Sequence, residues 1–295
     1  MLRAVAYVAL ILQAAFSTRT EMVVLPVTVT DARGRHVAGL SASDFHVFDN
    51  GHPSEIVTFQ RGDIPVTIGL VVDHSQSMSS KLGDVSAAAS AFARLAQRDD
   101  EFFVVMFSTE VRRPAFPDGK TFTSDPALLD AALHARIPGG PTALYDAVAE
   151  GLRQLPLGTS PRKALIVVTD GGDNASRLKY RDVRTLARRS QAVIYGVGLL
   201  GANSQEENPE LLKQLCRDSG GAAYFPGAGD TVTEVFAEIA RDLHEQYTVS
   251  IVAGAPVAAR MSHEIRVTAT GVDGKKLKVR TRSSYESRDE SKDAR

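Results

Sequence analysis

Five oxygen-bearing side chains in three short segments could together bind a metal ion. Asp73, Ser75 and Ser77 alternate in the run Asp-His-Ser-Gln-Ser, Thr142 follows a turn rich in glycine and proline, and Asp170 precedes two glycines. A loop with such alternation can aim three oxygens at one point, and ligation by oxygen alone selects a hard cation such as Mg²⁺ or Mn²⁺. The three segments therefore form a candidate divalent-cation site.

Each segment also has a purely structural interpretation. Asp73 could end a strand while a following serine caps the next helix, Thr142 could be a helix N-cap, and Asp170 could open a turn with Gly171. Any one of these interpretations is plausible when the segment is taken singly. It is not plausible that all three segments arose by chance in this order, so their combination favours a metal site.

To position these side chains, the chain needs strands that end beside them. Strand-like apolar runs alternate with helical periods, and Asp73 and Asp170 directly follow two of the runs. This alternation predicts an α/β fold, with a doubly wound, mostly parallel sheet covered by helices on both faces. Open sheets of this kind place ligands at the carboxyl ends of their strands. The predicted strands cover residues 66–72, 102–107, 164–168, 192–197 and 222–225.

The segments on either side of the α/β region have β character. Apolar residues alternate within 22–59, and Asn50-Gly51 predicts a hairpin turn whose return strand is 56–59. Strand-like runs reappear after Gln246. We therefore predict a small β-sandwich built from both chain ends, with the α/β domain inserted between them. The predicted boundaries are 21–62 and 247–286 for the sandwich, 63–246 for the inserted domain and 287–295 for a charged, disordered tail.

The first residues predict export from the cytoplasm. Arg3 precedes an apolar run, 4–16, that only Gln13 interrupts. The run is too short to cross a hydrocarbon core of about 30 Å, but it suits a secretory signal, with Ala15 and Ser17 placed like a cleavage site. A buried first strand or helix is the alternative, although no amphipathic period supports it. We expect residues 1–20 to be a signal peptide, the mature protein to be periplasmic or secreted, and no membrane span in the mature chain.

Composition excludes several other classes of function. The chain has 34 Lys plus Arg against 35 Asp plus Glu, and this balance argues against nucleic acid as a partner. Its single cysteine, Cys216, cannot form an internal disulfide or a cysteine-based metal cluster. Cys216 follows Leu212 by one helical turn, so we expect it in the core.

The Asp-x-Ser-x-Ser, Gly-Gly-x-Thr-Ala-Leu and Thr-Asp-Gly segments resemble a von Willebrand factor A (VWA) domain with a metal-ion-dependent adhesion site, over about 65–246. The flanks are also similar to the bacterial subfamily often called VWFA-related Acidobacterial-type proteins. The resemblance implies hydroxyl ligation of Mg²⁺ by one set of residues and a role through water or hydrogen bonds for another. The first set is Ser75, Ser77 and Thr142, and the second is Asp73 and Asp170.

This resemblance also implies one open coordination position, which predicts a binding function. A cation held by neutral hydroxyls stays electrophilic enough to accept an Asp or Glu carboxylate from a protein partner. We therefore expect a divalent-cation-dependent protein-binding module for adhesion or assembly, and no enzyme. One alternative is a structural or scaffold protein with a vestigial metal site. Another is a metal-dependent hydrolase with His74 as a general base. Gln76 stands where relatives usually have glycine, which leaves the tightness of the loop open.

Three further motifs are expected to be coincidental. Residues 217–221 resemble the nucleophile segment of trypsin-like proteases but lack its first glycine. Residues 196–201 fit the dinucleotide fingerprint by letter, but no helix pattern follows at once. Residues 61–63 spell Arg-Gly-Asp at a predicted domain boundary. We expect no protease, nucleotide-binding or integrin-binding function from them.

Overall fold

The computed structural model describes residues 22–62, 64–116, 118–134, 139–170, 172–200, 208–227, 230–254 and 262–286. The predicted signal peptide, 1–20, and the predicted disordered tail, 287–295, lie outside the described residues. Within those ranges, no helix is both long enough and apolar enough to cross a membrane.

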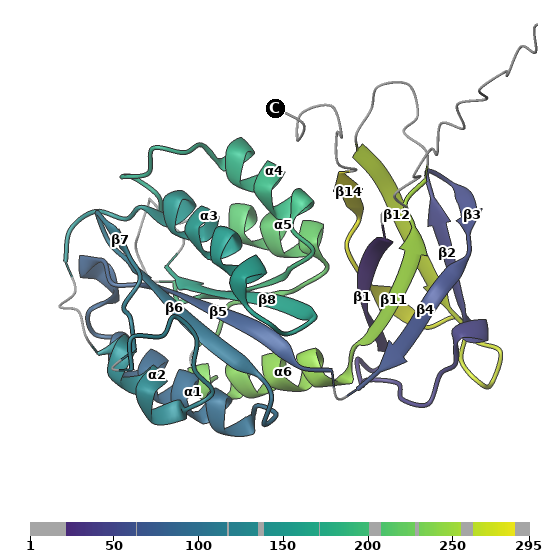
Figure 1. The fold of residues 1–295 in the computed structure, drawn as a ribbon, viewed down its shortest axis with the longest axis horizontal. Coiled ribbons are helices and arrows are strands. Elements are labelled where there is room, and N and C mark those ends of the chain that lie inside the picture. Colours follow the sequence, from purple (N-terminus) through teal and green to yellow (C-terminus); the bar gives the residue numbers. More distant parts are fainter. Residues whose placement is uncertain are drawn as a thin grey trace, which may run out of the picture.

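A six-stranded sheet forms the centre of the α/β region, in the order β10-β9-β8-β5-β6-β7 (Figure 1). Its strands are parallel except β7, which pairs antiparallel with β6. Every residue of β5 is buried, as expected where both faces of a parallel sheet are covered. The strands are β5 (Val66–Asp73), β6 (Glu101–Phe107), β7 (Val111–Arg112), β8 (Arg162–Thr169), β9 (Val193–Gly198) and β10 (Ala223–Tyr224).

Helices cover both faces of this sheet. Helices α1, α2 and α6 share one buried apolar cluster with the sheet, and α3, α4 and α5 share another. Helix α3 lies so close that a Cβ on its Gly151 would come within 2.7 Å of Leu165 Cδ1 on β8, so a larger residue there would force that side chain to shift. The helices are α1 (Leu82–Leu95), α2 (Pro126–Leu133), α3 (Leu144–Gln154), α4 (Tyr180–Arg189), α5 (Pro209–Ser219) and α6 (Val232–Glu245). The doubly wound α/β fold is confirmed.

Two four-stranded antiparallel sheets, β13-β1-β11-β4 and β14-β12-β2-β3, contain strands from both ends of the chain. They enclose a third apolar cluster, where the tilted rings of Phe45 and Tyr247 from opposite sheets pack with their centroids 5.2 Å apart. We call these two sheets the β-sandwich. Its strands are β1 (Met22–Thr30), β2 (Phe45–Asp49), β3 (His52–Ser54), β4 (Ile56–Arg61), β11 (Tyr247–Val252), β12 (Ser262–Ala269), β13 (Lys278–Arg280) and β14 (Ser284–Glu286).

The predicted hairpin at Asn50-Gly51 is present, but the predicted return strand is wrong. Asn50 and Gly51 have φ of 48° and 81°, as a two-residue hairpin turn requires. The tight turn lets pairing begin at once, so the return strand is β3, with Asp49 opposite His52. The later strand β4 pairs with β11 in the other sheet.

The α/β region and the β-sandwich meet without a long linker. Helix α6 passes into β11 through the single residue Gln246. In Figure 1, β5 starts beside the sandwich and runs away from it, so the carboxyl edge of the parallel sheet lies at the opposite end of the molecule.

Candidate metal centre

Strand β5 delivers Asp73 to the carboxyl edge of the sheet, where its side chain is fully buried. One carboxylate oxygen accepts the backbone N–H of Ser75 at 2.8 Å. The other accepts the hydroxyl of Thr169, the last residue of β8, also at 2.8 Å. Asp73 therefore fixes the turn of its own loop and ties that loop to the neighbouring strand.

The two serines of this loop lie side by side, with Ser75 Oγ 3.2 Å from Ser77 Oγ. Adjacent ligands of an octahedral Mg²⁺, each about 2.1 Å from the ion, are about 3 Å apart, so this spacing suits two neighbouring ligands. The interpretation that a serine after Asp73 caps the next α-helix is wrong, because the N-cap of α1 is Lys81 and no side chain caps it. Gln76 is exposed, and among described residues only Asn50 combines a side chain with positive φ, so this loop does not require glycine at Gln76.

Thr142 is held in place by its backbone. Its N–H donates to Asn174 Oδ1 at 2.7 Å, and its carbonyl accepts the N–H groups of Asn174 and Ala175 at 3.0 and 3.1 Å. The N-cap of α3 is Ala143, without a side-chain cap, so the N-cap interpretation of Thr142 is also wrong. The Thr142 hydroxyl makes no hydrogen bond to another described residue, which leaves it available as a ligand.

Asp170 follows directly after β8 and is only 7% exposed. Its carboxylate makes no hydrogen bond or ion pair with any other residue in the described part of the chain. Burying a charged group without a partner costs free energy. A cation bound at this edge of the sheet would offset that cost.

The two carboxylates influence one another. Burial raises the pKa of Asp73 to about 6, hydrogen bonds from Ser75 and Thr169 oppose that rise, and the negative charge of Asp170 adds to it. Asp73 is therefore costly to charge without a nearby cation. A divalent cation between them would remove the repulsion, which is the electrostatic fit expected of a metal centre.

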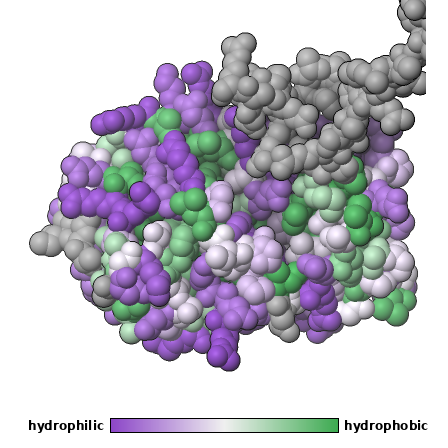
Figure 2. Space-filling model, in the orientation of Figure 1, coloured by the Kyte–Doolittle hydropathy of each residue, from purple (hydrophilic) through white to green (hydrophobic). Residues whose placement is uncertain are grey.

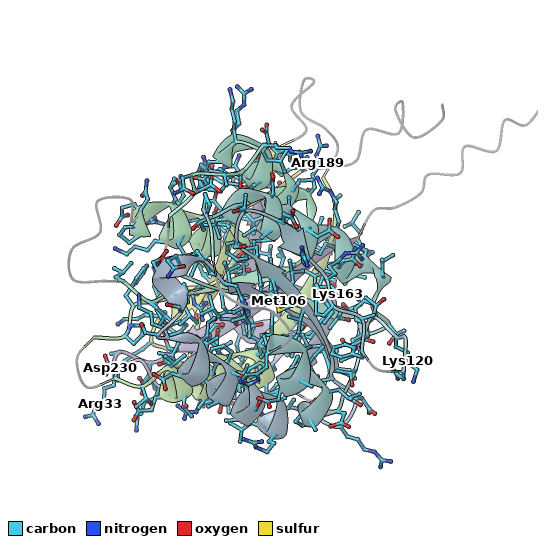
Figure 3. All side chains as sticks on the ribbon, turned by 90° about the vertical axis from the view of Figure 1, so that its left-hand side faces the viewer. Arg33, Met106, Lys120, Lys163, Arg189 and Asp230 are labelled. Atoms are coloured by element: carbon cyan, nitrogen blue, oxygen red, sulfur yellow. The ribbon has the colours of Figure 1, made fainter. Side chains whose placement is uncertain are left out.

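Backbone hydrogen bonds join the segments of the site. The N–H of Gly139 donates to the carbonyl of His74 at 2.7 Å, and that of Ala143 to the carbonyl of Ser108 at 2.8 Å. Within the described ranges, no group of three or more His, Cys, Asp and Glu could hold a metal ion. The predicted ligands include only two carboxylates, so this centre would depend on hydroxyls. Figure 3 looks onto this edge of the sheet, with Met106 of β6 near the centre of the view.

Two residues that position the site were missed by the sequence analysis. Thr169 was seen only as part of Thr-Asp-Gly, although its hydroxyl anchors Asp73. Asn174 was not singled out, although asparagine after a glycine pair is a common loop residue that bonds to nearby backbone. His74, the possible general base, is only 1% exposed, so its ring is shielded from a substrate in solution. Cys216 lies in the core, as expected.

Comparison with known proteins agrees with this fold. The sequence matches the family model described as von Willebrand factor type A domain over residues 67–238, more than half of the chain. No protein with a curated description matches it.

Among solved structures, a von Willebrand factor type A protein from Catenulispora acidiphila is 13% identical, with a TM-score of 0.51 over 94% of this chain and 76% of that one. BatB from Bacteroides thetaiotaomicron is 18% identical, with a TM-score of 0.46 over 60% of this chain and 97% of that one. Three N-terminal domains of the type V pili tip protein Mfa5 from Porphyromonas gingivalis are 12% identical, with a TM-score of 0.48 over 91% and 66%. At such identities the likeness concerns the fold alone. On the family match, the chain belongs to the von Willebrand factor type A domain family.

Proposed function

We propose that this VWA protein is a divalent-cation-dependent protein-binding module for adhesion or assembly. The observation that carries the proposal is Asp170, which is almost fully buried, has no partner among the described residues and repels the buried Asp73. VWA domains commonly bind a divalent metal. A metal-ion-dependent adhesion site at this place would explain why the fold tolerates both carboxylates.

In this proposal the hydroxyls of Ser75, Ser77 and Thr142 hold Mg²⁺ or Mn²⁺. Asp73 keeps the serine loop closed through its hydrogen bonds and, with Asp170, balances the charge. The metal, when bound, supplies an electrophilic centre for an Asp or Glu carboxylate of a protein partner. No proton transfer or bond cleavage is assigned to any residue of the site, so the function is binding without catalysis.

The proposal extends to compartment and organisation. We assign the chain to the periplasm or the extracellular space, with 1–20 as the signal peptide, and to the Acidobacterial-type subfamily of VWA proteins. Residues 21–62 and 247–286 would form one sandwich domain that carries the inserted domain, 63–246. The shared sheets, in which β1 pairs with both β11 and β13, support this division.

Calorimetric titration of the purified protein with MgCl₂ tests the metal centre directly. The wild type should bind one equivalent, and Asp170→Asn should lose most of that affinity. Asp99→Asn is a matched control, because Asp99 is an exposed carboxylate away from the site, and it should bind as the wild type does. A wild type that binds neither Mg²⁺ nor Mn²⁺ would refute the proposal and leave the vestigial-site alternative.

A further inference from the structure

The basic residues of helix α4 fall into two groups. Those in the second half of the helix form ion pairs with carboxylates of neighbouring elements. Arg184 and Arg188 lie 2.5 and 3.5 Å from Asp218, and Arg189 lies 2.8 Å from Glu286. Cations in the last turns of a helix also interact favourably with its dipole. These arginines therefore stabilise the fold and tie α4 to α5 and to β14.

The residues at the start of the same helix have no such explanation. Arg177 and Lys179 are exposed, and neither lies within ion-pair distance of a carboxylate in the described ranges. Arg181 reaches only its neighbour Asp182, at 3.6 Å. Lys179 is the N-cap of α4, a position where a cation opposes the helix dipole and lowers helix stability. Their charge is therefore not accounted for by the stability of α4. We call Arg177, Lys179 and Arg181 the basic rim.

The basic rim is adjacent to the candidate metal centre. Arg177 follows three residues after Asn174, which binds Thr142, so its Cα lies no more than about 11 Å from that of Asn174. Its backbone is fixed, because the N–H groups of Arg177 and Leu178 both donate to Asp146 of α3 at 3.0 Å. Figure 2 shows hydrophilic residues gathered on the upper left of the molecule, where Figure 1 places α4.

We propose that the basic rim selects an acidic polypeptide segment, so that the partner contributes several carboxylates rather than one. This inference rests on the proposed function, since one carboxylate of the segment would occupy the metal centre. An extended segment advances about 3.3 to 3.6 Å per residue, so carboxylates a few residues further along reach the basic rim. Exposed charges interact in a salt-dependent way, so the contribution of the rim should weaken as ionic strength rises.

A fluorescent peptide of ten glutamates is the probe, measured by anisotropy with the full chain in MgCl₂ or in EDTA. We expect Arg177→Ser combined with Lys179→Ser to weaken peptide binding about tenfold at low salt and to flatten its salt dependence. Calorimetric Mg²⁺ affinity should be retained. Arg33→Ser with Lys276→Ser removes the same charge from exposed positions on the β-sandwich and should bind the peptide as the wild type does (Arg33, Figure 3).

The outcomes separate the two proposals. Magnesium-dependent peptide binding that is unchanged in the rim variant would overturn the basic rim and leave the metal-dependent function standing. Peptide binding that survives EDTA and Asp170→Asn but is lost in the rim variant would support the rim and overturn the metal-dependent function. No binding of the peptide by the magnesium-loaded wild type, or equal loss in the sandwich control, would overturn the rim.

Discussion

Two buried carboxylates near opposite ends of the α/β region are in contrasting situations. Asp242 of α6, next to the β-sandwich, is 1% exposed and accepts hydrogen bonds from Thr28, Tyr195 and Arg280 at 2.9, 2.5 and 2.6 Å. Asp170, at the carboxyl edge, is 7% exposed and has no such partner among the described residues. A buried carboxylate that accepts hydrogen bonds from the protein stabilises the fold, and one without such a partner is a candidate ligand site.

The residues around Asp242 form a connected network of hydrogen bonds. The side-chain amide nitrogen of Gln246 donates to the hydroxyls of Thr28 and Tyr195, and its side-chain oxygen Oε1 accepts from Arg162 at 2.7 Å. Burial alone would lower the pKa of Arg280, but the carboxylate of Asp242 raises it above its ordinary value, so Arg280 stays charged. Because Thr28 and Arg280 come from sandwich strands, this network fastens α6 to the β-sandwich.

The largest expected effect on stability comes from removing the charged partner of Asp242. Arg280→Met leaves Asp242 buried without its cation, and we expect it to lower the free energy of unfolding by about 3 to 5 kcal/mol. Urea unfolding followed by circular dichroism measures this. Adding Asp242→Leu should restore part of the loss, because the uncompensated charge is then gone. A loss below about 1 kcal/mol in the single variant would show that Asp242 does not depend on Arg280.

The next largest effect is the pH dependence of stability at the candidate metal centre. The pKa of Asp73 in the folded protein, about 6, lies above its ordinary 3.8, so the folded state binds the proton more tightly than the unfolded state. Protonated Asp73 therefore contributes to the free energy of unfolding below about pH 4. This contribution, about 3 kcal/mol in EDTA, is lost as the pH rises through 6. The difference in unfolding free energy between wild type and Asp73→Asn should show this loss. A difference that is flat from pH 4 to 7 would contradict it.

Mg²⁺ should stabilise the candidate metal centre, where Asp73 and Asp170 repel one another, and should not affect the network around Asp242. At a Mg²⁺ concentration 100 times the dissociation constant, we expect a gain of about 2.7 kcal/mol in the free energy of unfolding. Asp170→Asn should show no gain, and Asp99→Asn should keep it. The measurement is urea unfolding with MgCl₂ or EDTA at pH 7. Equal gains in the wild type and Asp170→Asn would mean that the ion binds elsewhere.

The smallest effect concerns the edge of the Asp242 network. His36 lies 3.8 Å from Asp242 and 3.7 Å from Glu245, too far for hydrogen bonds. We expect His36→Asn to change the free energy of unfolding by at most about 1 kcal/mol, because polar contacts this long contribute little. A larger loss in the same urea assay would place His36 among the residues that hold the two parts together.

The sequence alone determined the features that depend on local pattern. Continuous apolar runs such as β5 are buried on both faces, so their alternation with helical periods was enough to predict the α/β fold. The candidate ligands could also be found from the sequence, because each belongs to a short motif, either at the end of a predicted strand or, for Thr142, after a turn rich in glycine and proline. Asn50-Gly51 predicted a hairpin, since few residue pairs adopt positive φ twice in succession.

Only the tertiary structure decided which distant groups meet. The change of sheet between β3 and β4 depends on β11, nearly 200 residues later, which no local pattern encodes. The sequence around Asp242 likewise does not show that this helix residue is buried and not an exposed aspartate. Its donors come from β1, β9 and β13, and Asp170 lacks such donors only because of where β8 ends. Whether a buried carboxylate is satisfied or awaits a ligand is a property of the assembled packing, since the hydrogen-bond partners are contributed by strands far apart in the chain.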